Sequence, residues 1–252
     1  ITSDITDRCI LKCKLELDYD GDININTRST DILNRLTNSS AEMNIGLVKY
    51  NGDNKKLTHI SIIKKSLHKY NGSIADAELL MYHESEGNQL PLIISIPITA
   101  NNSGGIIDNI IVESEQSPFD FNFNSYDIVP VNKPFYAYKA RLPDFVIYPN
   151  TEAEMVVFNK MYGLSVKTVN YEKLTEHSMT TQFEVSDGEQ ITYNEYGASK
   201  TTDSEFPINC EPYEDEDPNV GKWVWQSDTR AFGFDSVDLE KWAALAVVQI
   251  II

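Results

Sequence analysis

Hydrophobic and polar side chains alternate along much of the chain, which is the pattern of strands with one buried face. Residues 9–20 (CILKCKLELDYD) show this alternation most clearly. Residues 92–96 (LIISI) are almost continuously apolar, so we expect a central strand there, buried on both faces. Helical patterns are few, and only 151–155 and 170–178 are candidates. The pattern predicts a mostly β fold, with further strands at 57–63, 77–83, 91–98, 105–112, 145–148 and 154–158.

The pattern changes after a predicted domain at residues 1–185. Residues 186–219 contain turn signals, acids and prolines with few apolar side chains, which predicts an acidic extension or linker. Residues 220–252 are rich in aromatic side chains and end in the apolar run WAALAVVQIII at 242–252. That run is shorter than the roughly 20 residues of a membrane helix. It is either a buried strand or the first half of a C-terminal membrane anchor, and its place after the acidic linker favours the anchor.

Charge narrows the range of partners. The 252 residues include 38 acids and 21 Lys plus Arg, so the formal charge is −17. Residues 184–217 carry 11 acids against one base, Lys200, and therefore account for −10. Residues 1–183, with 23 acids and 17 bases, are only −6. Phosphate binding needs clustered Lys and Arg, so this balance argues against nucleic acid as a partner.

The chain has three cysteines and no Cys-x-x-Cys motif, so a zinc ribbon or thioredoxin-like site has no support. Cys9 and Cys13 lie four residues apart, which places them on one face of a strand. Either one of them, such as Cys13, forms a disulfide with Cys210, or all three are reduced core thiols, and both alternatives stay open. Glycosylation sequons matter only if the chain enters a secretory lumen. Three are present, at Asn38, Asn71 and Asn101.

Several segments carry a family resemblance through their order and spacing. Residues 66–72 (SLHKYNG) precede 75–83 (ADAELLMYH), and the apolar stretch 92–98 (LIISIPI) follows. Later, 136–142 (YAYKARL) leads into 145–148 (FVIY). The chain resembles the α-class carbonic anhydrases, which have Ser-Glu-His, then Ala-Glu-Leu-His-Leu-Val-His, then an apolar strand, and later Tyr-x-Tyr-x-Gly-Ser-Leu. It looks most like the carbonic-anhydrase-like proteins of large DNA viruses. The resemblance implies a large, twisted, mostly antiparallel sheet with short peripheral helices.

The family's catalytic zinc is held by three neutral imidazoles, which leave a fourth position for a water molecule. The resemblance places the third ligand position on Leu80. If the hairpin before residue 68 is shortened, the first two positions fall on His59 and Ser61. With the family's usual spacing they fall on Lys55 and Leu57 instead. At most one of the three is a histidine, so the resemblance predicts a chain with no catalytic zinc and no other cofactor.

Other positions of the family pattern are also informative. The glutamate of Ser-Glu-His, which orients a threonine hydroxyl over the metal-bound water, is replaced by Leu67. His68 and His83 match histidines with structural roles in the family, and we expect both to be buried and hydrogen-bonded. These substitutions predict a pseudoenzyme rather than an enzyme.

The resemblance to viral proteins and the apolar C-terminal run predict a structural component of a virion, at its surface, capsid or membrane. Its partners would be other virion or capsid proteins or a host receptor, with membrane contact through the C-terminus. Two alternatives stay open. One is a receptor- or glycan-binding attachment module, for which the charge of the domain disfavours a sulfated ligand. The other is an active carbonate dehydratase with a relocated metal site.

Overall fold

The computed structural model describes residues 1, 8–9, 13–19, 22–27, 36–38, 46–85, 87, 89–115, 119–142, 151–174 and 183–200. The chain divides into two compact units, Ile1–Thr201 and Thr202–Ile252. The second unit lies outside the described residues. The predictions that fall on Cys210, on most of the acidic linker and on the apolar run 242–252 therefore lie outside them too, as does the predicted strand 145–148.

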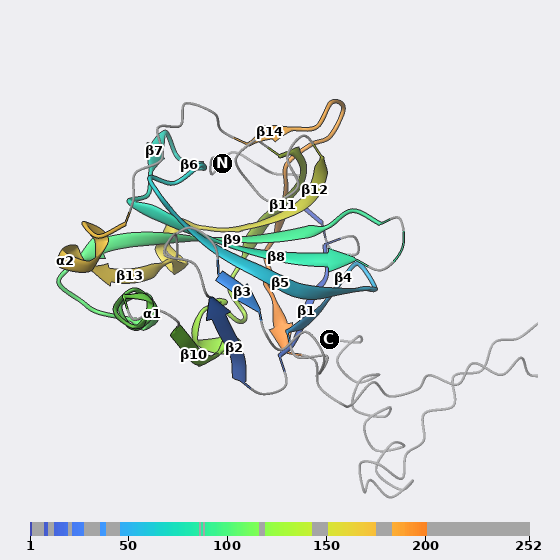
Figure 1. The fold of residues 1–252 in the computed structure, drawn as a ribbon. Coiled ribbons are helices and arrows are strands. Elements are labelled where there is room, and N and C mark those ends of the chain that lie inside the picture. Colours follow the sequence, from blue (N-terminus) through green and yellow to red (C-terminus); the bar gives the residue numbers. More distant parts are fainter. Residues whose placement is uncertain are drawn as a thin grey trace, which may run out of the picture. The chain divides into compact units, whose positions relative to one another are not determined.

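In the described part of the chain, fourteen strands form one sheet and two more form a separate hairpin. Nine of the fourteen lie side by side in the order β10-β2-β3-β5-β8-β9-β12-β11-β14, and the other five pair off this path. The long central strands are strongly twisted (Figure 1). Most neighbours are antiparallel, but β9 is parallel to β12 and β13. The mostly β prediction is confirmed. The elements are β1 (Leu15–Asp18), β2 (Asp22–Thr27), β3 (Leu36–Asn38), β4 (Leu47–Tyr50), β5 (Asp53–Lys64), β6 (Lys69–Tyr70), β7 (Ser73–Ile74), β8 (Ala77–Ser85), β9 (Leu92–Asn101), α1 (Ile106–Ser114), β10 (Phe119–Asn124), η1 (Ser125–Asp127), β11 (Phe135–Arg141), β12 (Glu152–Phe158), η2 (Lys160–Tyr162), β13 (Leu164–Lys167), α2 (Thr168–Tyr171), β14 (Glu184–Val185), β15 (Thr192–Asn194) and β16 (Ser199–Lys200).

Strand β9 lies at the centre of the sheet, and it is buried on both faces as its sequence predicts. Every residue from 92 to 98 is buried. Strand β8 pairs along one side, while β12 and then β13 pair along the other. The pairing with β12 ends at Ser95, and the pairing with β13 begins at Ile98. Pro97, which lacks a backbone N–H, lies in this interruption, where a central strand accommodates proline more easily.

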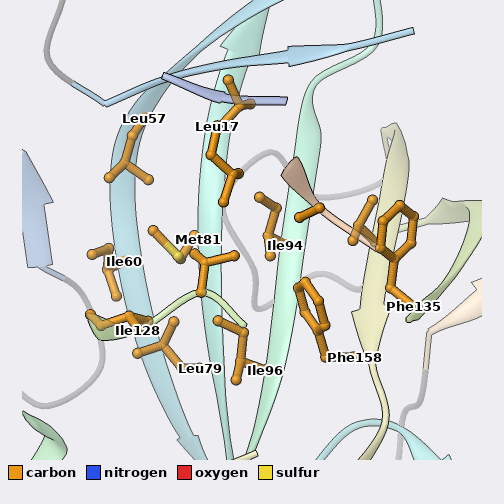
Figure 2. Close-up of a cluster of buried hydrophobic side chains, with 14 of the residues drawn as sticks. Leu17, Leu57, Ile60, Leu79, Met81, Ile94, Ile96, Ile128, Phe135 and Phe158 are labelled. Carbon is orange, nitrogen blue, oxygen red and sulfur yellow. The ribbon is translucent and has the colours of Figure 1, made fainter. Parts of the chain in front are cut away.

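The central strands separate two hydrophobic clusters, which we call the main core and the second core. Successive strand residues point to opposite faces. On β8, Leu79 and Met81 therefore lie in the main core, whereas Leu80 lies in the second core. Figure 2 shows the main core, where side chains of β5, β8 and β9 meet Phe135 and Phe158. Each fully buried aliphatic or aromatic side chain contributes about 1.5–3 kcal/mol.

Two helix and strand predictions were wrong. Residues 105–112, predicted as a strand, lie mostly in helix α1. Ile107, Ile110 and Ile111 repeat at the spacing of one helix face, and that face is buried. Residues 151–155, predicted as a helix, begin strand β12, because pairing with β9 and β11 on either side outweighs their weak helical preference. The helix predicted at 170–178 shares only its first two residues with α2.

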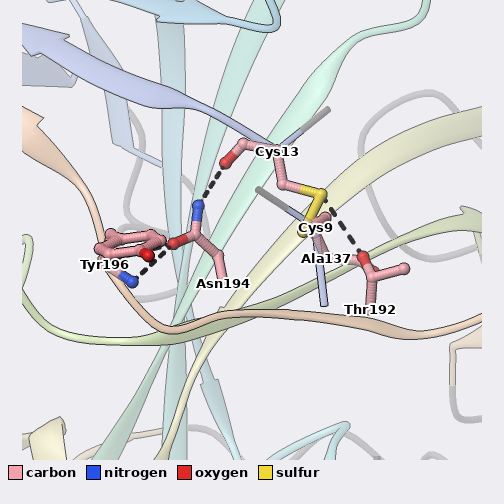
Figure 3. Close-up of a disulfide and its surroundings, with 7 residues drawn as sticks. Cys9, Cys13, Ala137, Thr192, Asn194 and Tyr196 are labelled. Atoms are coloured by element: carbon pink, nitrogen blue, oxygen red, sulfur yellow. Dashed lines mark hydrogen bonds between the residues drawn. A yellow bond between two sulfur atoms is a disulfide. The ribbon is translucent and has the colours of Figure 1, made fainter. Parts of the chain in front are cut away.

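The predicted strand 9–20 begins later than its pattern suggests, because β1 starts at Leu15. Cys9 and Cys13 form a disulfide with their Cα atoms 5.6 Å apart (Figure 3). The predicted pairing of Cys13 with Cys210 was wrong, and so was the alternative of three reduced thiols.

The sheet continues beyond residue 185, where the sequence placed the end of the domain. Strands β14 and β15 pair with β11, and β16 pairs with β1. The side chain of Asn194 on β15 donates a hydrogen bond to the carbonyl of Cys13 at 2.7 Å (Figure 3). The first part of the predicted acidic extension is thus built into the sheet, and its described acids, Asp187, Glu189 and Glu195, lie in the connections between short strands.

Gly197 gives a testable expectation about this C-terminal part. Its φ is +80°, and a Cβ there would lie 2.4 Å from the carbonyl oxygen of Lys133. Gly188 also has φ +80° but has open space around it. We expect Gly188→Ala to cost about 1 kcal/mol from backbone strain alone. Gly197→Ala is expected to cost a further 1–3 kcal/mol, roughly, from overpacking. Thermal unfolding of the two variants measures the difference, and equal costs would contradict the close approach to Lys133.

Candidate functional site

A buried carboxylate lies at the centre of a polar cluster in the second core. Glu78 on β8 is fully buried. Its Oε2 accepts hydrogen bonds from Ser66 Oγ (2.7 Å) and from the backbone N–H groups of Leu67 (2.7 Å) and His68 (3.2 Å). Its Oε1 accepts hydrogen bonds from Nδ1 of His68 and the hydroxyl of Ser95. The segment between β5 and β6 is thereby folded around one carboxylate, which we call the Glu78 cluster.

Hydrogen bonds and charge keep Glu78 ionised. Burial by itself raises the pKa of this carboxyl group, because it disfavours the charged form. The positive charge and hydrogen bond of His68, with the hydroxyls of Ser95 and Ser66, outweigh burial and lower the pKa of Glu78 to about 2. A fully buried charge is tolerated only when it is paired and hydrogen-bonded in this way.

His68 links the Glu78 cluster to strand β11. Its Nε2 lies 2.6 Å from the hydroxyl of Tyr138, and its ring stacks on Phe183 with centroids 5.0 Å apart. Burial and the charge of Glu78 raise the pKa of Tyr138, so this phenol stays neutral. Both ring nitrogens of His68 have partners within the fold. The arrangement therefore ties three segments together and leaves neither nitrogen to act as a ligand.

His83, at the other end of β8, is a neutral buried imidazole. Its Nδ1 donates to the carbonyl of Met81 at 3.1 Å, which leaves Nε2 to accept from the hydroxyl of Tyr19 at 3.1 Å. Burial lowers the pKa of His83 to about 3. Like His68, His83 has both ring nitrogens engaged inside the protein, and it is also fully buried.

The structure brings three of the sequence-derived ligand positions together. Strands β5 and β8 pair so that Ser61 lies opposite Leu80 and His59 lies opposite Tyr82. His59, Ser61 and Leu80 therefore share one face of the sheet, that of the second core. Leu80 has no exposed surface, and Ser61 is 5% exposed. This group of positions presents one imidazole, one hydroxyl and one aliphatic side chain.

The alternative positions Lys55 and Leu57 lie elsewhere. The register of the β5–β8 pairing shifts just after Leu57. The side chain of Leu57 packs into the main core, on the sheet face opposite to that of Leu80. Lys55 is 1% exposed. Its Nζ donates to the carbonyl of Leu90 at 2.9 Å and forms an ion pair with Glu154 Oε2 at 3.2 Å. Neither side chain is grouped with Leu80, so this alignment assembles no common site.

Within the described ranges, no three or more His, Cys, Asp and Glu side chains are grouped as metal ligands. The same residues contain no helix that is long and apolar enough to cross a membrane.

Solved structures similar to this chain include an α-carbonic anhydrase from Thermovibrio ammonificans in complex with the inhibitor sulfanilamide. The TM-score is 0.60, with 13% sequence identity over 76% of this chain and 84% of that chain. The chain has the α-carbonic anhydrase fold. The α-carbonic anhydrase of Photobacterium profundum gives a TM-score of 0.57 and 14% identity over 76% of this chain and 87% of that one.

The same fold relates the chain to dioscorin, solved in complex with ascorbate. That structure has a TM-score of 0.60 and 16% identity over 80% of this chain and 85% of dioscorin. No protein-family model and no curated protein sequence matches the chain. The structural similarity establishes the α-carbonic anhydrase fold, and sequence identities of this size carry no information about activity.

On this α-carbonic anhydrase fold, the most informative polar groups are ones that the sequence did not single out. Glu78 and Ser95 both belong to the Glu78 cluster, but from the sequence they were interpreted only as parts of apolar strands. The sequence did contain a signal, because each is a polar residue within a mostly apolar predicted strand, and both are buried in the structure. Leu67, which the family resemblance places at the position of the glutamate, donates its backbone N–H to Glu78 while its side chain lies in the second core.

Proposed function

We propose that this protein uses the α-carbonic anhydrase fold as a non-catalytic structural and binding scaffold. The observation that carries the proposal is the composition of the His59, Ser61 and Leu80 group. These residues share the face on which the family resemblance puts its zinc ligands. Leu80 has no donor atom, and a serine hydroxyl is a poor substitute for a neutral imidazole. One histidine does not hold zinc against water.

The surroundings of the group support the same conclusion. The family's glutamate is replaced by Leu67, which lies in the second core. Leu80 packs among apolar side chains there and has no exposed surface. The other buried histidines, His68 and His83, have both ring nitrogens occupied within the protein. A zinc-bound hydroxide, which the carbonate dehydratase reaction needs, therefore has no ligand set to form on.

The biological role that fits such a scaffold is that of a virion component. The proposal follows from the resemblance to carbonic-anhydrase-like proteins of large DNA viruses and from the apolar run at 242–252. A membrane-anchored or capsid-associated protein of this kind binds another virion protein or a host receptor through its surface. The charge of −6 on residues 1–183 favours a protein partner over a sulfated glycan.

Zinc binding tests the absence of catalysis directly. We expect the full-length protein, incubated with excess zinc and then dialysed, to retain far less than one zinc per chain and to show no CO₂ hydration above the buffer rate. Elemental analysis and stopped-flow hydration assays measure the two quantities. Stoichiometric zinc with measurable hydration would overturn the proposal in favour of an active dehydratase.

A designed gain of zinc binding sharpens this test. In the variant Ser61→His/Leu80→His, three imidazoles share one face with the native His59, so we expect zinc to raise its Tm. The matched control is Ser61→His/Leu79→His, which adds the same two side chains but directs one into the main core. Zinc should not raise the Tm of the control or of the native protein. A rise for the native protein would contradict the proposed scaffold.

A further inference from the structure

The Cys9–Cys13 disulfide carries information about where this protein folds. Both cysteines are buried, at 8% and 5% exposure. Disulfides form and persist in oxidising compartments and are rare in the reducing cytosol. The secretory lumen is such a compartment, and it is also where Asn-x-Ser/Thr sequons receive oligosaccharides. If the chain folds in that compartment, its sequons can be glycosylated, and their positions in the structure decide which of them the transferase can reach.

The sequon at Asn71 lies at the tip of an exposed hairpin. Strands β6 and β7 pair Tyr70 with Ser73, so Asn71 and Gly72 are the two residues of the turn. Their φ values are +48° and +81°, as in the tight turn that favours Asn-Gly. Asn71, Gly72 and Ser73 are all exposed. The backbone N–H of Asn71 donates to the carbonyl of Ile1 at 2.9 Å, and the hydroxyl of Ser73 donates to the carbonyl of Tyr70 at 3.0 Å.

The sequon at Asn101 is placed less favourably. The side chain of Asn101 is engaged on both sides, since Nδ2 donates to Ser165 Oγ at 3.2 Å and Oδ1 accepts from the N–H of Ser103 at 2.6 Å. Asn38 is the last residue of β3, and the two serines that complete its sequon lie outside the described residues. An acceptor amide must reach the active site of a large transferase, which an exposed hairpin tip allows.

We propose that Asn71 is an N-glycosylation site and that this protein folds in a secretory lumen. The donor is a lipid-linked oligosaccharide diphosphate. The amide nitrogen Nδ2 of Asn71 forms a bond to C1 of the first sugar, and the C1–O bond to the diphosphate breaks. The lipid diphosphate leaves with that electron pair, and the amide loses one proton to the transferase. Ser73 supplies the hydroxyl that completes the sequon. This inference is independent of the zinc question and of the proposed scaffold role.

Peptide mass spectrometry of the protein from its natural source tests the assignment. Treatment with peptide N-glycosidase converts a glycosylated asparagine to aspartate. We expect the peptide spanning Asn71 to show this conversion in most molecules, and the peptide with Asn101 to stay unconverted. Unmodified Asn71 in that material would overturn the proposal, and so would free thiols at Cys9 and Cys13.

Ser73→Ala and Ser73→Thr form a matched pair of variants, and neither changes Asn71, the turn residue with positive φ. The full chain is directed into the secretory pathway of cultured eukaryotic cells and analysed by gel mobility. Ser73→Ala removes the sequon and should abolish the glycosidase-sensitive shift, whereas Ser73→Thr keeps the sequon and should retain it. Asn101→Gln should leave the shift unchanged. A shift that survives Ser73→Ala, or its absence in the native chain with an intact Cys9–Cys13 disulfide, would overturn the assignment.

Discussion

Replacing Glu78 with glutamine is expected to destabilise the fold by about 3–5 kcal/mol, the range measured when one partner of a buried ion pair is removed. The carboxylate accepts hydrogen bonds from five donors, and an amide cannot satisfy all of them. His68 would be left without its negative partner inside the second core. For a domain of this size the loss lowers Tm by roughly 10 °C. Denaturant unfolding and calorimetry measure both quantities.

The control for this variant is Glu84→Gln. Glu84 lies on the same strand, β8, but is exposed, and exposed substitutions of this kind change stability by less than about 0.5 kcal/mol. A cost below about 1 kcal/mol for Glu78→Gln would mean that the Glu78 cluster is not a stabilising element. Equal costs at the two positions would lead to the same conclusion.

Acid is expected to destabilise the fold from about pH 6.5 downward, mainly through His83. The folded state lowers the pKa of His83 from 6.5 to about 3 by burial. Between these pH values the unfolded chain binds a proton that the folded protein does not. His83 therefore contributes full stability above pH 6.5, and about 1.4 kcal/mol is lost for each pH unit below it. Urea unfolding measured at a series of pH values gives this slope.

The Glu78 carboxyl adds a loss of the same sign at lower pH. Its pKa falls from 4.5 to about 2 on folding, so its contribution is complete above pH 4.5 and disappears as the pH falls through about 2. The variant His83→Gln removes the imidazole and should flatten the slope between pH 6.5 and 4.5. Tyr19→Phe should retain the slope, because burial rather than the phenol lowers the pKa of His83. An unchanged slope in His83→Gln would contradict this assignment.

The sequence predicted the central strands better than the periphery. Strands β8 and β9 are apolar runs that a buried sheet position explains on its own, and both were predicted. Helix α1 was read as a strand because Ile107, Ile110 and Ile111 are β-branched. Their spacing is that of one helix face, and packing of this face decided the outcome. Local preference is a weak guide where tertiary packing stabilises the other conformation.

The ligand positions that the resemblance implies stay a prediction. Motif order gave His59, Ser61 and Leu80 as one of two alternative sets, and spacing alone left both open. In the structure, Ser61 pairs with Leu80 and the register shifts after Leu57. This pairing puts His59, Ser61 and Leu80 on a common face and leaves Leu57 on the other. The Glu78 cluster depends on side chains from three separate segments, and no local pattern in the sequence brings Ser66, Glu78 and Ser95 together.

The sequence by itself determined that this chain is mostly β, that its most buried strand is 92–98, and that the resemblance supplies at most one histidine of three. These conclusions depend on residue identity and short-range periodicity, which can be read from a short stretch of sequence without knowledge of the fold. Only the tertiary structure decided that Cys13 pairs with Cys9 rather than with Cys210. It likewise showed that Glu78 is an ionised buried group and that Asn71 lies on an exposed turn. These properties depend on burial and on contacts between distant segments, and the folded chain creates both.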